Sequence, residues 1–163
     1  MKSKGQTHDG RLVVGWRERI DLPEWGVHFI RAKIDTGART SAIHVEDIEP
    51  VGEDRVRFRV VVNREGDRSI PVEADVVRRS RVRPSHGRVQ ERFVVATKVQ
   101  IGEVVKRIEF SLVCRQHMLC RALIGRRALD DDFFVDASRA YLVSSRKRRT
   151  RSAMKSRGSA EAG

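Results

Sequence analysis

Hydrophobic and polar residues alternate with a period of two along much of this chain. In residues 55–62, Val56, Phe58, Val60 and Val62 alternate with arginines. Because successive side chains of a β-strand point to opposite faces, this segment is predicted to be a half-buried strand. Further β-rich runs cover residues 70–77, 92–101 and 104–113. Short strands separated by Gly-bearing turns predict an all-β domain, either a barrel or a sandwich.

The remaining elements follow from turn and helix signals. Residues 11–35 are predicted to form one strand, a Pro23/Gly26 turn and a second strand that ends at Asp35. Residues 78–91 are basic and contain Pro84 and Gly87, which suit a hairpin tip or a mobile loop. Helix signals are scarce, and the best candidate is a short helix within residues 126–134.

The organisation expected from these patterns is one domain over residues 11–143. Residues 1–10 are predicted to be flexible, and residues 144–163 to be a basic disordered tail because no apolar pattern survives there. No apolar run is long enough to span a membrane, and residues 1–10 lack the apolar stretch of a signal peptide. We therefore expect a cytoplasmic protein without a membrane partner.

The net charge of +12 changes the list of expected partners. The predicted tail carries seven Lys and Arg residues against one Glu, so about half of the excess charge belongs to it. A basic surface attracts polyanions such as RNA, DNA or acidic polypeptides, and the charge alone does not choose among them.

Several classes of enzyme lack their motifs in this sequence. It contains neither HExxH nor a GxxxxGK[ST] phosphate loop. Cys114 and Cys120 match no common zinc knuckle and are interpreted as reduced, partly buried thiols. The acidic run 130–132 is interpreted as a solvated helix face rather than a metal site. Neither a metal nor a cofactor is predicted.

The segment Asp35-Thr36-Gly37 directly follows the strand-like run VHFIRAKI. A carboxylate at the end of a buried strand is held rigidly, as a catalytic group must be. The Thr36 hydroxyl can pin the loop, Gly37 permits close backbone approach, and Ala38 is small. The alternative is an ordinary turn in which the Asp side chain bonds to its own backbone.

A second motif, ALIGRRAL at residues 122–129, places an apolar run and Gly125-Arg126 before the expected helix. Together the two motifs resemble those of retropepsin-like aspartic proteases. The resemblance implies that the second segment passes beside the catalytic loop and braces it.

A longer match points to one bacterial family. The chain contains GWR at 15–17, KIDTGARTSAIH at 33–44, Arg92, MLCRALIGRRAL at 118–129 and FFVDASRAYL at 133–142. These segments resemble the family often labelled "ATP-dependent zinc protease", whose members often accompany ATP-grasp ligases that add glutamates to a ribosomal protein. The resemblance implies a closed or partly open retropepsin-like barrel with one short C-terminal helix. The zinc and ATP of the label have no matching motif here.

An aspartic protease needs two carboxylates around one water, and this chain has one Asp-Thr-Gly. The resemblance therefore implies a homodimeric endopeptidase in which Asp35 of each copy activates the water. Thr36 would buttress the partner loop, and Gly37 would lie beside the substrate backbone. The hairpin 78–91 is the expected flap, with 63–69 as second choice, and its arginines would suit an acidic, glutamate-rich polypeptide.

Further residues beside the two motifs are expected to bind substrate or support the loop: Ala38, Arg39, Ser41, His44, Gly125 and Arg126. For Arg39, Ser41 and His44 the alternative is a purely structural bond to backbone at the dimer interface.

Two other functions compete with the protease. One is a non-catalytic retropepsin-like module that binds RNA or a ribosomal partner, with weak nucleic-acid contact through the basic tail. The other is metal-dependent proteolysis, as the family label states.

Overall fold

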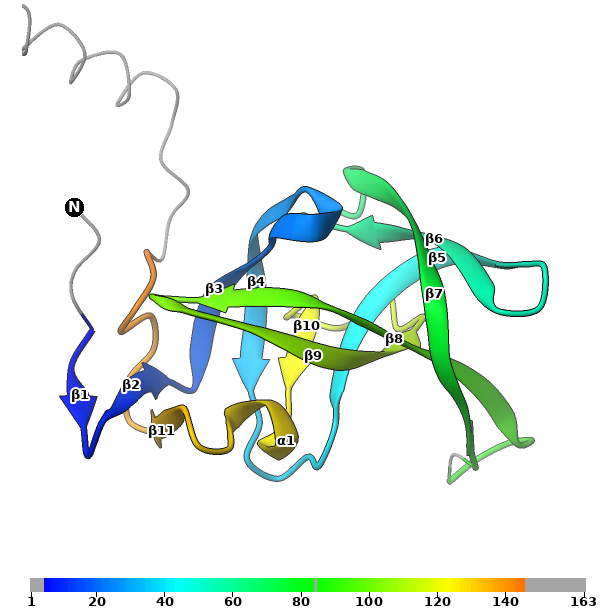
Figure 1. Cartoon of the computed structure of the whole chain (residues 1–163). Coiled ribbons are helices and arrows are strands. Elements are labelled where there is room, and N and C mark those ends of the chain that lie inside the picture. Colours follow the sequence, from blue (N-terminus) through cyan, green and yellow to red (C-terminus); the bar gives the residue numbers. More distant parts are fainter. Residues whose placement is uncertain (1–4, 84, 146–163) are drawn as a thin grey trace, which may run out of the picture.

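The computed structural model describes residues 5–83 and 85–145, and β-strands dominate them (Figure 1). In chain order the elements are β1 (Thr7–His8), β2 (Arg11–Gly15), β3 (Arg17–Leu22), the 3-10 helix η1 (Pro23–Trp25), β4 (Val27–Ile34), β5 (Ser41–Val51), β6 (Arg55–Val61), β7 (Ser69–Val82), β8 (Gln90–Ile101), β9 (Val104–Val113), β10 (Ala122–Ile124), α1 (Arg126–Leu129) and β11 (Phe133–Asp136). The all-β class and the single short helix predicted from the sequence are confirmed for the described residues.

The larger sheet closes on itself through its pairings. Strand β10 lies parallel to β4, β4 pairs with β3, and β3 pairs with β8. Strand β8 pairs with β9, β9 lies parallel to β5, and β5 returns to β10. Hairpins β5–β6, β6–β7 and β7–β8 extend one side of this ring, and a small sheet β1–β2–β11 lies beside it. The short β10 is thus held between β4 and β5.

The core fills the space inside this closed sheet. In β6, Val56, Phe58 and Val60 are buried while the alternating arginines are exposed, as the period of two predicts. Trp25 of η1 packs edge-on against Phe58 at a centroid distance of 5.4 Å. The strand alternation seen in the sequence therefore decides which face of each strand meets the core.

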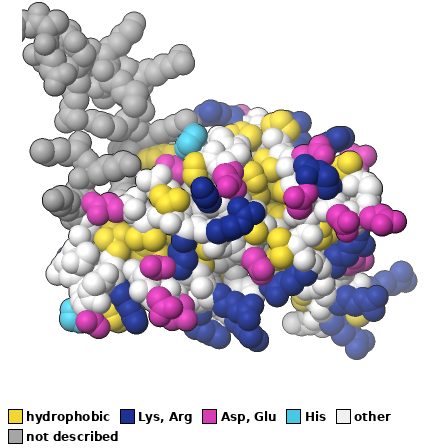
Figure 2. Space-filling view, viewed as in Figure 1, with side chains coloured by type: hydrophobic (Ala, Val, Ile, Leu, Met, Phe, Trp, Pro, Cys, Tyr) yellow, Lys and Arg dark blue, Asp and Glu magenta, His cyan; other side chains and the backbone are white. Residues whose placement is uncertain are grey.

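The outer surface carries charges of both signs (Figure 2). Many arginines on the strands form ion pairs with carboxylates on other strands, such as Arg55–Asp75, Arg78–Glu109 and Arg79–Glu91. These cross-strand pairs balance a large part of the positive charge on β6–β9.

The helix is shorter than the sequence signal suggested. It ends at Leu129, and the chain turns at Asp131, whose φ is +65°. Carboxylates at 130–132 are unfavourable at a helix C-terminus, where the backbone dipole is negative. Phe133 and Phe134 then enter β11, where they pair with Leu12 and Val13 of β2.

A buried carboxylate joins the end of β2 to residues 142–144. Glu18, fully buried, accepts hydrogen bonds from the backbone N–H groups of Gly15, Leu142 and Val143 at 2.9, 2.8 and 3.3 Å. The Ser144 hydroxyl donates to the other oxygen of Glu18 at 2.5 Å. Ser144, the first residue of the predicted tail, is thus bonded to the domain. Residues 146–163 of that tail lie outside the described residues.

Strand pairing also begins inside the segment predicted to be flexible, because β1 pairs with β2. None of the helices in the described part of the chain has the length and hydrophobicity needed to cross a membrane.

Candidate active site

The Asp35 loop joins the end of β4 to the start of β5. Ile34 is buried, and the next backbone N–H, that of Asp35, donates to the carbonyl of Ile124 at 2.8 Å. The Asp35 Oδ1 atom accepts the Gly37 N–H at 2.9 Å, and the Asp35 carbonyl accepts the Ala38 N–H at 3.3 Å. Asp35 is half-buried, whereas Thr36 and Gly37 are exposed. The loop is rigidly bonded yet presents its tip at the surface.

The segment around Gly125 lies against this loop, as the motif pair predicted. Strand β10 runs parallel to β4, with Ile124 opposite Ile34. Beyond β10, the Arg126 and Arg127 N–H groups donate to the carbonyls of Ala38 and Arg39 at 2.8 and 3.1 Å. The Arg126 guanidinium donates to the Thr36 carbonyl at 3.0 Å. Three carbonyls of the loop, those of Thr36, Ala38 and Arg39, therefore accept hydrogen bonds from residues at the start of α1.

Gly125 is required by the closeness of the two segments. A Cβ atom at this position would lie 2.5 Å from the Thr40 carbonyl oxygen, well inside contact distance. The Gly125 N–H donates to the buried Ser41 hydroxyl oxygen at 3.0 Å. The hydrogen bond between Gly125 and Ser41 thus holds the end of the loop where β5 begins.

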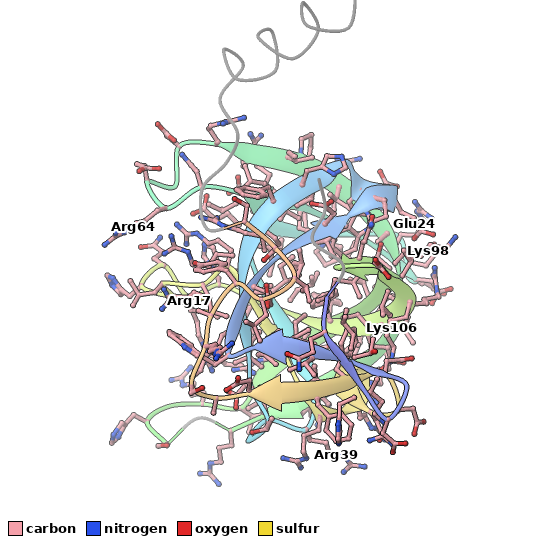
Figure 3. All side chains as sticks on the ribbon, turned by 90° about the vertical axis from the view of Figure 1, so that its left-hand side faces the viewer. Arg17, Glu24, Arg39, Arg64, Lys98 and Lys106 are labelled. Atoms are coloured by element: carbon pink, nitrogen blue, oxygen red, sulfur yellow. The ribbon has the colours of Figure 1, made fainter. Side chains whose placement is uncertain are left out.

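Other predicted site residues lie apart from this clamp. His44 is buried in β5, and its Nδ1 accepts the Arg115 N–H of the same chain at 3.0 Å, so it makes a backbone bond within the domain. Burial, followed by the nearby Arg121 cation, holds the pKa of His44 below its usual value. Arg39 is exposed at the edge of the molecule (Figure 3), so its charge is solvated rather than buried.

Two further sequence interpretations concern the two cysteines and a possible metal site. Cys114 is exposed and Cys120 is buried, both as free thiols, and burial raises the pKa of Cys120. Within residues 5–83 and 85–145, no three His, Cys, Asp or Glu side chains gather closely enough to hold a metal ion.

The sequence interpretation missed a row of cations that leads to the loop. In the β3–β4 pairing, Arg17 stands opposite Lys33 and Arg19 opposite Arg31. Lys33 precedes Asp35 by two residues, so this outward-facing row ends at the loop. The signal was present in the alternation of residues 17–22 and 27–34, joined by a tight turn.

A carboxylate held at a strand end, in a loop braced by a second apolar-Gly segment within a closed β-sheet, is the arrangement that the resemblance to retropepsin-like aspartic proteases implies. A family model described as "Retropepsin-like aspartic endopeptidase RimB" matches residues 13–146. The chain belongs to this RimB-like family.

Curated relatives and one solved structure show the same kinship. A probable alpha-L-glutamate ligase of Shewanella halifaxensis is 32% identical over 139 residues, which cover 83% of this chain and 30% of that protein. The ligase of the same name from Desulfotalea psychrophila is 33% identical over 130 residues, covering 77% of this chain and 28% of that protein. The chain thus spans less than a third of these relatives.

The crystal structure of protein Lpg0085 from Legionella pneumophila, of unknown function, superposes with a TM-score of 0.67 at 25% identity. The match covers 81% of this chain and 98% of that one.

Proposed function

We propose that this protein is a homodimeric aspartic endopeptidase in which Asp35 from each of two copies activates one water molecule. The observation that carries the proposal is the clamp on the Asp35 loop, in which Ile124 and Arg126 bond its backbone on both sides of Thr36. Such support costs conformational freedom, and it is expected where a side chain must be held within a fraction of an ångström.

The proposed reaction uses the two carboxylates as a base and an acid. Two carboxylates a few ångströms apart share one proton, because both cannot easily carry a charge. The ionised Asp35 takes a proton from the water as the water oxygen bonds to the peptide carbonyl carbon. The protonated Asp35 of the second copy donates to the carbonyl oxygen. When the tetrahedral intermediate collapses, the C–N bond breaks, the first Asp35 gives the proton taken from water to the leaving amine, and a hydroxyl of the intermediate returns a proton to the Asp35 of the second copy.

The exposure of Thr36 and Gly37 suits a loop that meets its own copy across a two-fold axis. Strands β7 and β8 remain paired as far as Val82 and Gln90, so the 78–91 hairpin reaches out with an exposed tip. We assign this hairpin the role of the flap that covers the substrate.

The substrate proposed is an acidic, glutamate-rich polypeptide. Proteins named probable alpha-L-glutamate ligase contain a region related to this chain that makes up 30% or 28% of their length. A peptidase related to part of a glutamate ligase is expected to act on the glutamate chains that such a ligase makes. Association with an ATP-grasp ligase and a cytoplasmic location are parts of this proposal.

The test combines mass and cleavage. Sedimentation of the purified protein should give twice the chain mass, and the protein should cleave glutamate-rich or mixed peptides. Asp35→Asn should lower the cleavage rate by about 10³-fold or more while leaving the dimer intact, since it removes the acid–base group and little else. Asp54→Asn, in an exposed turn, is the matched control and should keep full activity.

A monomer at all concentrations would refute the mechanism. Cleavage that survives Asp35→Asn and stops with a chelator would establish metal-dependent proteolysis instead.

The second candidate is a non-catalytic module that binds RNA, favoured by the net charge of +12. Absence of cleavage of any peptide at any pH, together with RNA binding that weakens steeply with salt, would support it.

A further inference from the structure

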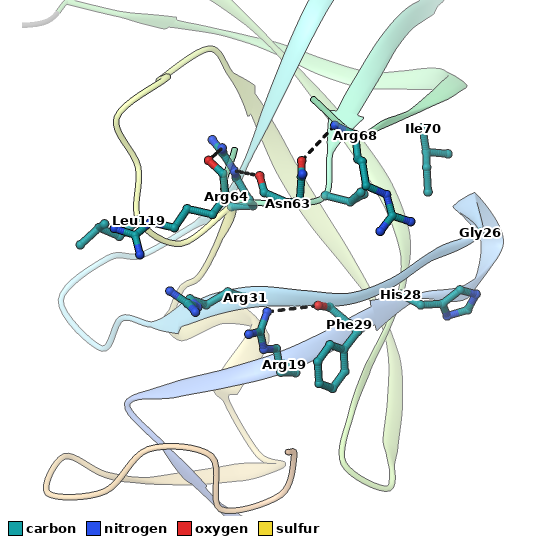
Figure 4. Close-up of a pocket in the computed structure, with 12 residues that line it drawn as sticks. Arg19, Gly26, His28, Phe29, Arg31, Asn63, Arg64, Arg68, Ile70 and Leu119 are labelled. Atoms are coloured by element: carbon teal, nitrogen blue, oxygen red, sulfur yellow. Dashed lines mark hydrogen bonds between the residues drawn. The ribbon is translucent and has the colours of Figure 1, made fainter. Parts of the chain in front are cut away.

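A cavity of about 420 Å³ opens between the β3–β4 hairpin, the turn that joins β6 to β7, and the segment before β10 (Figure 4). Five arginines line it, and none of its twelve lining residues is acidic: the arginines are Arg19, Arg31, Arg64, Arg68 and Arg121. We call this cavity the arginine pocket. Its charge contrasts with the ion-paired surface of β6–β9.

The walls of the pocket are fixed by hydrogen bonds. Arg121, almost fully buried, donates to the carbonyls of Asn63 and Arg64 at 3.1 and 2.9 Å. The Asn63 side chain accepts the Arg68 N–H at 3.0 Å, which closes the turn. Arg64 and Arg68 are therefore carried on a turn that is held in place before any ligand binds.

The floor of the pocket comes from the β3–β4 hairpin. Arg19 lies over the Phe29 ring at 4.8 Å and donates to the Phe29 carbonyl at 3.4 Å. The Arg31 Nε atom is buried and has no hydrogen-bond partner among the described residues. Burial and, next, the neighbouring Arg31 cation lower the pKa of Arg19. The pocket thus holds positive charges close together at an electrostatic cost that an anion would offset.

Three of the five arginines lack an ion-pair partner among the described residues. In the described residues, Arg31, Arg64 and Arg68 form no ion pair, whereas arginines on β6 and β7 do. The pocket also has apolar side chains, among them Phe29, Ile70 and Leu119. Guanidinium groups beside apolar surface match a ligand that carries carboxylates on short methylene stems.

The position of the pocket relates it to the Asp35 loop. Arg31 lies in β4, and Asp35 follows the end of that strand four residues later, a span of about 13 Å at 3.3 Å per extended residue. The pairs Arg19/Arg31 and Arg17/Lys33 mark successive steps along that path. An extended peptide would cover this distance with about four residues.

We propose that the arginine pocket binds carboxylate side chains of an acidic polypeptide segment, about four residues from the bond that lies at Asp35. The inference rests on the proposed function for the identity of that bond, whereas binding itself requires only the pocket. It assigns Arg31 and Arg64 as residues that determine specificity rather than as catalytic residues.

Binding is tested in the Asp35→Asn background, where no substrate is consumed. A fluorescent hexaglutamate peptide should bind, and a hexaglutamine peptide should bind at least tenfold more weakly. Changing Arg31→Gln together with Arg64→Gln should weaken hexaglutamate binding at least tenfold. The matched control is Arg57→Gln with Arg59→Gln on the exposed face of β6. It removes the same charge and should change binding less than twofold.

Equal losses in the pocket and control variants would overturn the inference, because binding would then follow total charge alone. An RNA oligonucleotide of equal charge that displaces hexaglutamate at lower concentration would also overturn it in favour of a phosphate ligand.

Cleavage separates this inference from the proposed function. With active dimer, the pocket variants should raise KM and leave kcat nearly unchanged. Peptides with acidic residues only next to the scissile bond should be cleaved less efficiently than those with acidic residues four positions away. Hexaglutamate bound through the pocket but never cleaved would refute the proposed function alone; cleavage indifferent to Arg31 and Arg64 would refute the pocket alone.

Discussion

Glu18, which lies in β3, and Asp35, which follows β4, are two carboxylates that the fold holds in opposite ways. Glu18 points inward from β3, is fully buried, and accepts hydrogen bonds from three backbone N–H groups and a hydroxyl. Asp35 follows β4, is half-buried, and accepts the Gly37 N–H on one oxygen. In the Asp35 loop it is the backbone, rather than the carboxylate, that is bonded to the rest of the fold.

This difference is the one expected if Glu18 has a structural role and Asp35 has the catalytic role proposed above. A buried carboxylate must have its acceptor sites filled, because an unsatisfied charge in the interior is expensive. A carboxylate that is to exchange protons with a water must keep an oxygen accessible, and its position must then be fixed through its backbone. We infer that the clamp from Ile124 and Arg126 does this for Asp35.

The largest difference between the two carboxylates is expected in stability when each of them is neutralised. Glu18→Gln should lower the free energy of unfolding by about 3 kcal/mol, because it removes a charged acceptor from buried N–H groups and brings in an unmatched donor. Asp35→Asn should change it by less than about 0.5 kcal/mol. Urea denaturation of both variants measures this, and equal losses would show that Asp35 is also a structural anchor.

The next test acts on the clamp rather than on the carboxylate. Gly125→Ala forces a methyl group against the Thr40 carbonyl, so we expect a loss of about 2 kcal/mol in stability together with reduced cleavage. Gly37→Ala is a matched variant in the same loop, since its Cβ would meet only Asp35 Oδ1, at 3.2 Å. Thermal unfolding should show the smaller loss for Gly37→Ala, and the reverse order would remove Gly125 from the clamp.

The smallest expected effect depends on pH and involves His44. Its pKa is lowered in the folded protein, so below about pH 6.5 the unfolded chain takes up the proton first and stability falls as the pH decreases. Above that pH both states are neutral at this residue, and it contributes no slope. One proton gives at most about 1.4 kcal/mol per pH unit.

His44→Asn keeps an acceptor near the Arg115 N–H without a titrating ring. Unfolding curves between pH 5 and 7 should therefore be flatter for this variant than for the natural protein. Identical slopes would place the pH response on other groups.

The sequence predicted the β-strands and the neighbouring motifs because each depends on local information. Alternation over 55–61 is read from adjacent residues, and the pairing of KIDTGA with ALIGRR followed from a family pattern. The short helix within residues 126–134 was predicted, but not that it ends at Leu129, since the pairing of Phe133 and Phe134 with β2 depends on residues more than a hundred positions away.

Two features could not be predicted for the same reason. Glu18 stands in phase with the buried Ile20 and Leu22, which signals an inward carboxylate, but its partners Leu142 and Ser144 lie at the other end of the domain. The arginine pocket draws its lining from three remote segments, each of which looks like ordinary solvated charge by itself.

The contacts of Glu18 have an evolutionary consequence. They hold residues 142–144 against Gly15, and Gly5 lies nearby: an added Cβ on Gly5 would meet a methyl group of Val143 at 2.9 Å, and both described ends lie on the same side in Figure 1. A domain whose entry and exit touch can be inserted into another polypeptide, or cut out of one, without stretching its fold. This geometry suits a unit that recurs inside longer proteins, as in the ligase-named relatives, and it makes circular permutation across residues 5 and 143 a feasible way to engineer it.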